Sequence, residues 1–241
     1  MTSILYDRVL SPFYDALAAK CPPWIHPNAI TLLGGLSCAT SLAAMAAERH
    51  AAAAALFTIY HALDNLDGMV ARRTGKTSSL GHVLDHAIDG TVGVVASCCS
   101  ISSAIFGAPH ALRFTLCCGM ATLLICHAAE LVSGTPTLGS RYFGADELFL
   151  LNSFALTFKA VTSHPLLSLG DVTSVQATGL VLIVLLALTT VRDWRCLFGL
   201  ALFGALCAWG PSPAPVVAYA ITFPALLAFN SQRHHRPKPS S

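Results

Sequence analysis

Residues 64–89 read DNLDGMVARRTGKTSSLGHVLDHAID, and four of the chain's 12 acidic residues lie in this one stretch. Its first half places a stripe along one face of a helix, spaced i, i+3, i+4, i+7 and i+8: Asp64, Asp67, Gly68, Ala71 and Arg72. Its second half places another stripe, spaced i, i+4 and i+8: Gly81, Asp85 and Asp89. The polar and glycine-containing residues 73–79 are typical of a short turn. The stretch therefore predicts two helices folded back on each other.

Such a hairpin points the four aspartates at one another. Carboxylates that share a partly dry site repel strongly and stay ionised only when cations compensate their charge. Oxygen ligands suit Mg²⁺ or Mn²⁺, which bind a few carboxylates together with substrate phosphates. Two such ions would clamp a pyrophosphate and stabilise both the attacking and the leaving oxygen. We therefore predict a two-ion metal site whose ligands are Asp64, Asp67, Asp85 and Asp89.

The composition of the chain indicates a membrane protein. Its 241 residues are 54% apolar and 11% charged, with a mean hydropathy of +0.64, which is too apolar for a soluble domain of this length. The net charge of +2 gives no indication of a nucleic-acid partner. A helix needs about 20 apolar residues to cross a bilayer, and such segments lie near residues 29–48, 51–71, 87–107, 112–132, 144–162, 175–191, 195–209 and 214–230.

These segments predict an all-α polytopic membrane protein with about six to eight transmembrane helices. The range reflects the polar residues of the fifth segment and the shortness of the seventh. No repeat or second domain is visible, so residues 1–241 are expected to form a single integral-membrane domain. Residues 1–24 alternate apolar and charged positions, which predicts an interfacial helix. Residues 232–241 are polar, basic and proline-containing, which predicts a disordered tail.

The distribution of basic residues predicts the orientation of the domain in the membrane. With eight spans, the 64–89 stretch lies on the same side as both termini and as most lysines and arginines. The opposite side keeps only Arg49, Arg113 and Lys159. Because positive charge is enriched in cytoplasmic loops, the aspartates are expected to face the cytoplasm. A soluble nucleotide substrate would be found on that side.

The two stripes of residues 64–89 resemble the motif of the CDP-alcohol phosphatidyltransferase family, which runs D-x2-D-G-x2-A-R, eight further residues, then G-x3-D-x3-D. All eight fixed positions match. The resemblance implies transfer from a CDP-activated compound, with CMP as the leaving group and with the aspartate-bound metals bridging the two phosphates. It also implies that cytidine lies between the two helices. The substrate-binding residues it implies are Asn28, Thr31, Gly68, Ala71, Arg72 and Gly81.

The acceptor hydroxyl must lose its proton as it attacks phosphorus, so the reaction needs a general base. Three residues compete for this role. Asp89 is the usual proposal for the family, because the fourth aspartate lies nearest the expected acceptor. His86 follows Asp85 directly, and Glu147 lies in the apolar segment FGADELFLL, where a charge needs a partner. The base therefore stays open between these three side chains.

Further segments resemble the choline/ethanolamine phosphotransferase branch of the family. They are WIHPNAIT, DNLDG…ARRTG…SSLG…LDHAID and CH…LVSG…RYFG..E, and the resemblance is dense between residues 24 and 150. It implies transfer of phosphoethanolamine or phosphocholine from the CDP ester to diacylglycerol, with His86 and Glu147 as a base pair and His127 as a further polar position. Ala87 and Ile88 depart from the branch pattern, which leaves the headgroup open.

Other functions remain as alternatives. A CDP-diacylglycerol donor reacting with inositol, glycerol phosphate or serine would use the same motif with donor and acceptor reversed. An ion-coupled transporter would use the aspartates as an ion path, but the sequence shows no duplicated halves. A non-catalytic relative would be expected to lose one aspartate, and all four are present. The family also implies a homodimer and, in a eukaryote, the membrane of the endoplasmic reticulum or Golgi.

Overall fold

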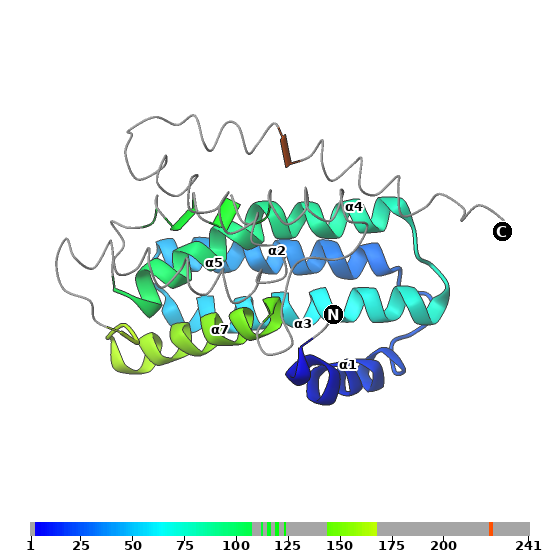
Figure 1. Ribbon diagram of the computed structural model, residues 1–241, viewed down its shortest axis with the longest axis horizontal. Coiled ribbons are helices and arrows are strands. Elements are labelled where there is room, and N and C mark those ends of the chain that lie inside the picture. The colour runs from blue at the N-terminus through cyan, green and yellow to red at the C-terminus, as the bar shows by residue number, and fades with distance from the viewer. Residues whose placement is uncertain are drawn as a thin grey trace, which may run out of the picture.

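The computed structural model describes residues 3–107, 112, 115–116, 119–120, 123, 144–167 and 222–223. Every regular element in this part of the chain is a helix, which confirms the all-α prediction there. Helix α2 (Pro27–Ala46) packs against both α3 (His50–Thr74) and α4 (Ser79–Ile88), and α7 (Ala145–Thr162) packs against α3. These helices form one elongated bundle, as Figure 1 shows.

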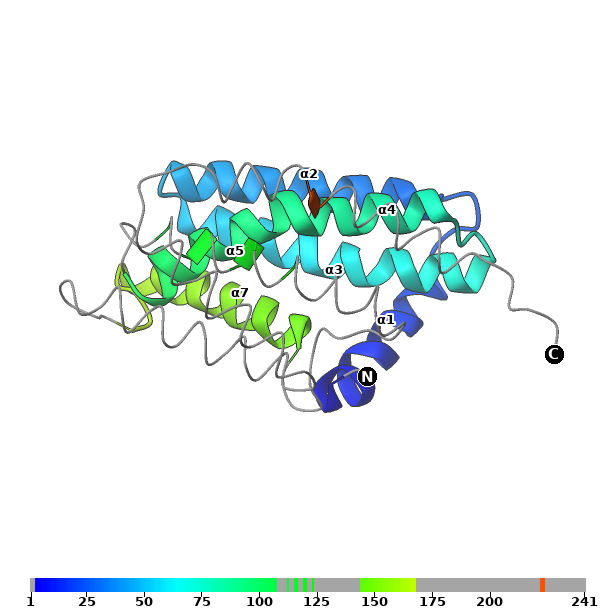
Figure 2. The same cartoon turned by 45° about the horizontal axis from the view of Figure 1, so that its top comes forward.

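The N-terminal segment forms the short helix expected there. A π-helical turn, η1 (Tyr6–Leu10), continues into α1 (Ser11–Ala18), which lies obliquely at one end of the bundle (Figure 2). Pro12 is the second residue of α1 and lacks an N–H, so one backbone hydrogen bond is missing where η1 passes into α1. The apolar stripe of the segment faces outward, since Val9, Phe13 and Leu17 are 55%, 60% and 40% exposed. Its position on a bilayer surface stays a prediction.

Two buried serines join α2 to α3. Ser37 Oγ donates a hydrogen bond of 2.8 Å to the carbonyl of Leu56, and Ser41 Oγ donates one of 2.8 Å to the carbonyl of Ala53. Both small side chains let the two backbones approach closely, which is how helices associate in an apolar environment. The C-terminal half of α2 is therefore linked to the N-terminal half of α3.

The turn between the two aspartate stripes lies where the sequence predicts it. Helix α3 ends at Thr74, and Gly75 adopts φ +66°, a left-handed conformation that glycine tolerates at the end of a helix. Ser78 then caps α4 by accepting a 3.0 Å hydrogen bond from the Gly81 N–H. Beyond α4 the helix continues through a π-helical turn η2 (Asp89–Gly93), α5 (Val94–Ser100) and a second π-helical turn η3 (Ile101–Ile105).

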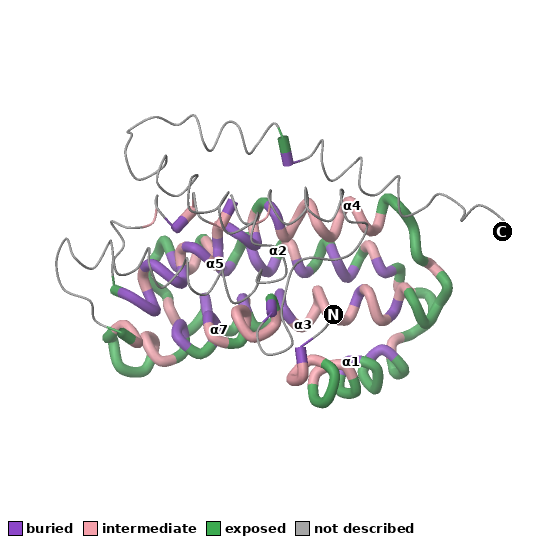
Figure 3. Tube along the Cα trace, viewed as in Figure 1, coloured by how far each residue is buried: buried purple, intermediate pink, exposed green. Residues whose placement is uncertain are grey.

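The buried core lies where α2, α3, α5 and α7 meet, and buried positions follow the inner sides of these helices in Figure 3. Phe57, Tyr60, Phe106 and Leu156 are among its largest side chains. Within the described residues, two helices are long and apolar enough to cross a membrane, Pro27–Ala46 and Ser79–Ile105.

The number of spans stays a prediction. Helices α3 and α7 cover the expected segments 51–71 and 144–162, but the motif gives α3 more charged side chains than an ordinary span. The expected segments 175–191 and 195–209 and the tail 232–241 lie outside the described residues. Segments 112–132 and 214–230 are described at isolated positions only.

Candidate metal centre

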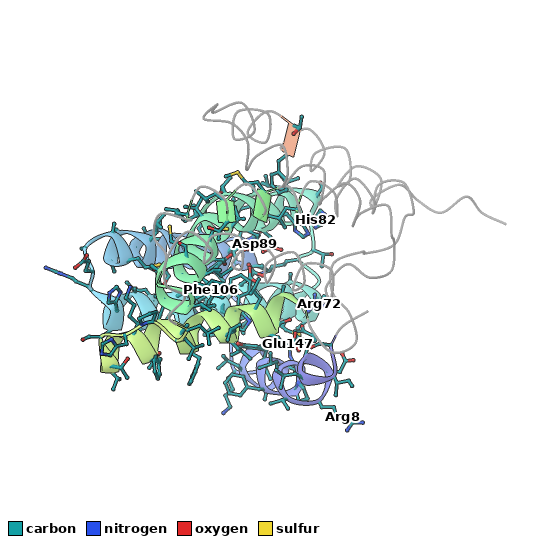
Figure 4. The ribbon with its side chains drawn as sticks, turned by 60° about the vertical axis from the view of Figure 1, so that its left-hand side comes forward. Arg8, Arg72, His82, Asp89, Phe106 and Glu147 are labelled. Carbon is teal, nitrogen blue, oxygen red and sulfur yellow. The ribbon has the colours of Figure 1, made fainter. Side chains whose placement is uncertain are left out.

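Three aspartates from two consecutive helices converge inside the bundle. One carboxylate oxygen each from Asp64 on α3, Asp85 on α4 and Asp89 in η2 lie within 4.8 Å of one another. The carboxyl groups of Asp64 and Asp89 lie close enough to interact directly, and Figure 4 shows Asp89 within the group of helices. Two carboxyl groups tolerate such contact only when a proton or a cation lies between them. The arrangement therefore fits a divalent cation with oxygen ligands.

The fourth aspartate, Asp67, lies beside this group but outside it. Its Oδ2 accepts a hydrogen bond of 2.5 Å from Thr31 Oγ1 on α2, and Asp67 is 5% exposed. Asp67 is close enough to Asp85 for the two charges to interact. Thr31, which the family resemblance places near the nucleotide, thus holds a predicted metal ligand through its hydroxyl.

A tyrosine that the sequence analysis did not single out contacts the cluster. Tyr60 Oη donates a hydrogen bond of 2.5 Å to Asp89 Oδ1, and Tyr60 is 1% exposed. Tyr60 lies four residues before Asp64 on α3, so both side chains leave the same side of the helix. That spacing was the available signal, but an aromatic residue in an apolar segment is ordinarily read as core.

Gly81 permits a close approach between α4 and the start of α2. A Cβ at this position would lie 3.0 Å from Asn28 Oδ1 and 3.2 Å from Ser78 Oγ. Asn28 is itself held at the beginning of α2, where its N–H donates to His26 Nδ1 over 3.2 Å. The absence of a side chain at Gly81 therefore serves helix packing, and its role toward a nucleotide stays a prediction.

Arg72 folds back along α3 over the glycine of the motif. Its Nη1 would lie 3.2 Å from a Cβ at Gly68, and its Nη2 donates to Met69 Sδ over 3.3 Å. Arg72 is exposed and Ala71 is half-buried. Burial raises the pKa of Tyr6, and the guanidinium of Arg72 opposes that rise. The N-terminal segment therefore lies beside the positive charge of the motif.

The remaining candidates for the general base lie in different places. His86 Nδ1 lies 3.4 Å from Asp85 Oδ2, so this imidazole borders the aspartate group. Glu147 Oε2 accepts a 2.7 Å hydrogen bond from the Gly144 N–H at the start of α7, while Oε1 is buried and has no hydrogen-bond partner among the described residues. Among the described residues, no hydrogen bond or ion pair joins Glu147 to His86. Of these two side chains, His86 is the one that contacts a member of the aspartate group.

A second polar group, also missed in the sequence, ties α3 to α7. His61 Nε2 lies 3.0 Å from Asp146 Oδ1, and Asn65 Nδ2 donates to the same oxygen over 3.1 Å. A carboxylate oxygen accepts hydrogen bonds, so the contact assigns His61 Nε2 as the donor. The His61 ring stacks on Phe149, with centroids 5.1 Å apart and planes 15° apart. The group fixes α7 against the helix that carries Asp64.

Replacing Asp146 should destabilise the fold. Asp146→Leu removes the acceptor of two donors, and the His61 side chain is only 3% exposed, so we expect a loss of about 2 kcal/mol. Asp146→Asn keeps an acceptor oxygen and should lose less. The unfolding temperature of the detergent-solubilised protein measures both effects, and equal temperatures for Asp146→Leu and the parent would show that the group has no structural role.

Comparison with known proteins agrees with the geometry of the centre. The sequence pattern of the CDP-alcohol phosphatidyltransferase family matches residues 24–202. The chain is 37% identical over 149 residues to a cholinephosphotransferase 1 of Gallus gallus, covering 56% of this chain and 44% of the relative. It is 32% identical over 151 residues to a choline/ethanolaminephosphotransferase 1 of Arabidopsis thaliana, covering 58% and 35%.

A relative with a different activity matches as well. A CDP-diacylglycerol–serine O-phosphatidyltransferase of Encephalitozoon cuniculi (strain GB-M1) is 33% identical over 169 residues, covering 65% of this chain and 44% of the relative. In each of these three cases the match spans less than half of the relative's length. The family match, by contrast, spans most of the chain and includes the three converging aspartates. The chain belongs to the CDP-alcohol phosphatidyltransferase family.

Proposed function

We propose that this protein is an integral-membrane phosphotransferase that transfers phosphoethanolamine or phosphocholine from CDP-ethanolamine or CDP-choline to diacylglycerol and releases CMP. The observation that carries the proposal is the convergence of Asp64, Asp85 and Asp89 within 4.8 Å in a chain of this family. Its relatives that bear the names cholinephosphotransferase and choline/ethanolaminephosphotransferase support the choice of donor.

The family uses a divalent metal, and the acidic cluster is the proposed place for Mg²⁺ or Mn²⁺. When bound, two such ions would neutralise the pyrophosphate and the charge that develops on the leaving CMP. Asp64, Asp85 and Asp89 would hold them, and Asp67 would contribute beside Asp85 while Thr31 restrains its carboxylate. The protein itself fixes these ligands on rigid helices, which positions the donor without a covalent intermediate.

The nucleotide is proposed to lie where α2, α3 and α4 approach one another. Gly68, Ala71 and Gly81 present little bulk along this boundary, and Asn28 lies at its edge. Arg72 supplies an exposed positive charge from the end of the aspartate stripe, suited to a phosphate oxygen. A metal cluster at one end of this boundary and an arginine at the other would hold the two charged parts of a CDP ester.

We propose His86 as the base that takes the proton of the acceptor hydroxyl. Its Nδ1 lies 3.4 Å from Asp85 Oδ2, so the imidazole stands next to the proposed metal ligands. Asp89, by contrast, already accepts the hydroxyl of Tyr60, and the carboxylate of Glu147 already accepts the Gly144 N–H at the start of α7. Glu147 is therefore proposed as a neighbouring acid of lesser effect.

The remaining assignments concern the setting of the enzyme. We propose that the aspartates face the cytoplasm, that α1 lies on the bilayer surface with Val9, Phe13 and Leu17 toward the lipid, and that the protein works as a homodimer. The exposed stripe on α1 supports the second point. A location in the endoplasmic reticulum or Golgi would follow in a eukaryotic cell.

A substrate assay tests the function. Purified full-length protein with Mg²⁺ or Mn²⁺ and diacylglycerol should release CMP from CDP-ethanolamine or CDP-choline, offered separately, and the preferred donor names the headgroup. The similarity to the serine phosphatidyltransferase makes CDP-diacylglycerol with serine the necessary parallel assay, with inositol and glycerol phosphate beside it. Turnover with CDP-diacylglycerol alone would show that the lipid, and not the amino alcohol, carries the CDP group. This result would overturn the proposed substrates but not the proposed metal centre.

A further inference from the structure

A hydrogen bond from a buried tyrosine links α3 to the π-helical turn η2. Tyr60 Oη donates to Asp89 Oδ1 over 2.5 Å. Asp89 is one of the three aspartates that converge, and it is the first residue of η2. A carboxylate on such a helix can rotate about its own side-chain bonds, so a fixed donor on a second helix restricts the directions in which its oxygens point.

The ring that carries this hydroxyl is held on two sides. The centroid of Phe57, one turn earlier on α3, lies 5.9 Å from that of Tyr60 with an interplanar angle of 67°. Phe149 of α7 lies 5.4 Å away at 79°. Tyr60 is 1% exposed, so water cannot replace Asp89 as the partner of its hydroxyl, and a buried hydroxyl without an acceptor is costly.

Gly93 provides the space into which the hydroxyl reaches. It lies four residues after Asp89, at the end of η2. A Cβ on Gly93 would lie 2.5 Å from Tyr60 Oη, whereas its next neighbours would be Tyr60 Cζ at 3.4 Å and the Ile88 carbonyl at 3.5 Å. Within the part of the chain that the structure describes, an added methyl group would therefore collide only with the hydroxyl.

We propose that Tyr60 is a positioning residue that orients the Asp89 carboxylate for a divalent cation, and that Gly93 is required because it leaves room for the Tyr60 hydroxyl. The inference rests on the proposed metal centre and adds the group that aligns one of its ligands. Partners that hold a metal ligand in orientation typically change metal affinity about 10- to 100-fold when they are removed.

The first test is metal affinity without substrate. Mn²⁺ binding to purified full-length protein in detergent, followed by electron paramagnetic resonance of the free ion, should be about 10- to 100-fold weaker in Tyr60→Phe. Tyr14→Phe is the matched control, because Tyr14 is also buried on α1 and its hydroxyl makes no hydrogen bond to the described residues. Tyr14→Phe should bind Mn²⁺ like the parent. Equal affinity of Tyr60→Phe and the parent would overturn the proposal.

The second test separates alignment from a general loss of packing. Gly93→Ala should weaken Mn²⁺ binding to a similar degree, because the new methyl displaces the Tyr60 hydroxyl. In the Tyr60→Phe background the same change meets no atom of the described residues closer than 3.4 Å, so Gly93→Ala should cause no further loss. A purely structural role would give the same loss in both backgrounds, and such additivity would contradict the proposal.

The outcomes distinguish this inference from the proposed function. If the parent binds no Mn²⁺, the metal centre fails and the inference fails with it. If the parent binds Mn²⁺, Asp85→Asn abolishes binding and both Tyr60→Phe and Gly93→Ala bind normally, the metal centre stands and the inference alone is wrong. Should Tyr60→Phe not elute as folded protein, Gly93→Ala by itself decides: weakened binding supports the alignment and unchanged binding excludes it.

Discussion

Asp85→Asn is expected to abolish CMP release and Mn²⁺ binding together while leaving the protein folded. Asp85 is the member of the cluster contributed by α4, and its oxygen lies within 4.8 Å of those of Asp64 and Asp89. An amide keeps the shape of the side chain but removes the negative charge that a divalent ion requires. A bound metal ion stabilises the charge of the transition state by several kcal/mol. Losing this stabilisation should lower turnover by at least about 10³-fold.

The control for this change is an aspartate of similar chemistry elsewhere. Asp15 on α1 forms an ion pair of 3.3 Å with Arg73, and both side chains are at least half exposed, so Asp15→Asn should alter neither stability nor turnover appreciably. CMP release at several Mg²⁺ concentrations, with size-exclusion chromatography as the check on folding, measures both variants. An Asp85→Asn protein that still turns over would exclude the metal assignment.

His86→Ala should be the second most damaging change. Removing a general base typically lowers turnover about 10²- to 10⁴-fold, and it should do so with little change in Mn²⁺ affinity, because His86 neighbours a proposed ligand without being one. Glu147→Gln should cost much less, since glutamine keeps an oxygen that can accept the Gly144 N–H. Single-turnover CMP release over a range of pH compares the two.

A histidine at the far end of the bundle is the control for that comparison. His164 lies just beyond the C-terminal end of α7 and is exposed, so His164→Ala should behave like the parent. If Glu147→Gln lost more turnover than His86→Ala, Glu147 on α7 would be the better candidate for the group that accepts the proton. The assignment of the base to His86 would then be wrong.

Helical spacing alone predicted that aspartates close to one another in the sequence converge. Asp85 and Asp89 are four residues apart, and the short turn at 75–78 brings them back toward Asp64. The helical period and the turn residues were therefore sufficient to predict that these side chains meet. The same reasoning placed Asp67 with the other three. It could not foresee that Thr31, 36 residues earlier, would take one of its oxygens.

The missed residues share a different physical origin. Tyr60 meets Asp89 across 29 residues and His61 meets Asp146 across 85 residues. Such contacts depend on how whole helices dock, and no periodicity within one segment encodes them. An apolar run containing one tyrosine or one histidine has the same pattern whether the polar atom points to a catalytic group or to a helix carbonyl.

The hydroxyl bonds between α2 and α3 restrict where the protein could open for the proposed lipid substrate. Ser37 and Ser41 each donate to a carbonyl of α3, and separating these helices would leave two buried hydroxyls without these acceptors. We therefore expect α2 and α3 to stay together. A long-chain substrate would have to enter between another pair of helices. Cross-linking α2 to α3 should consequently leave lipid access intact.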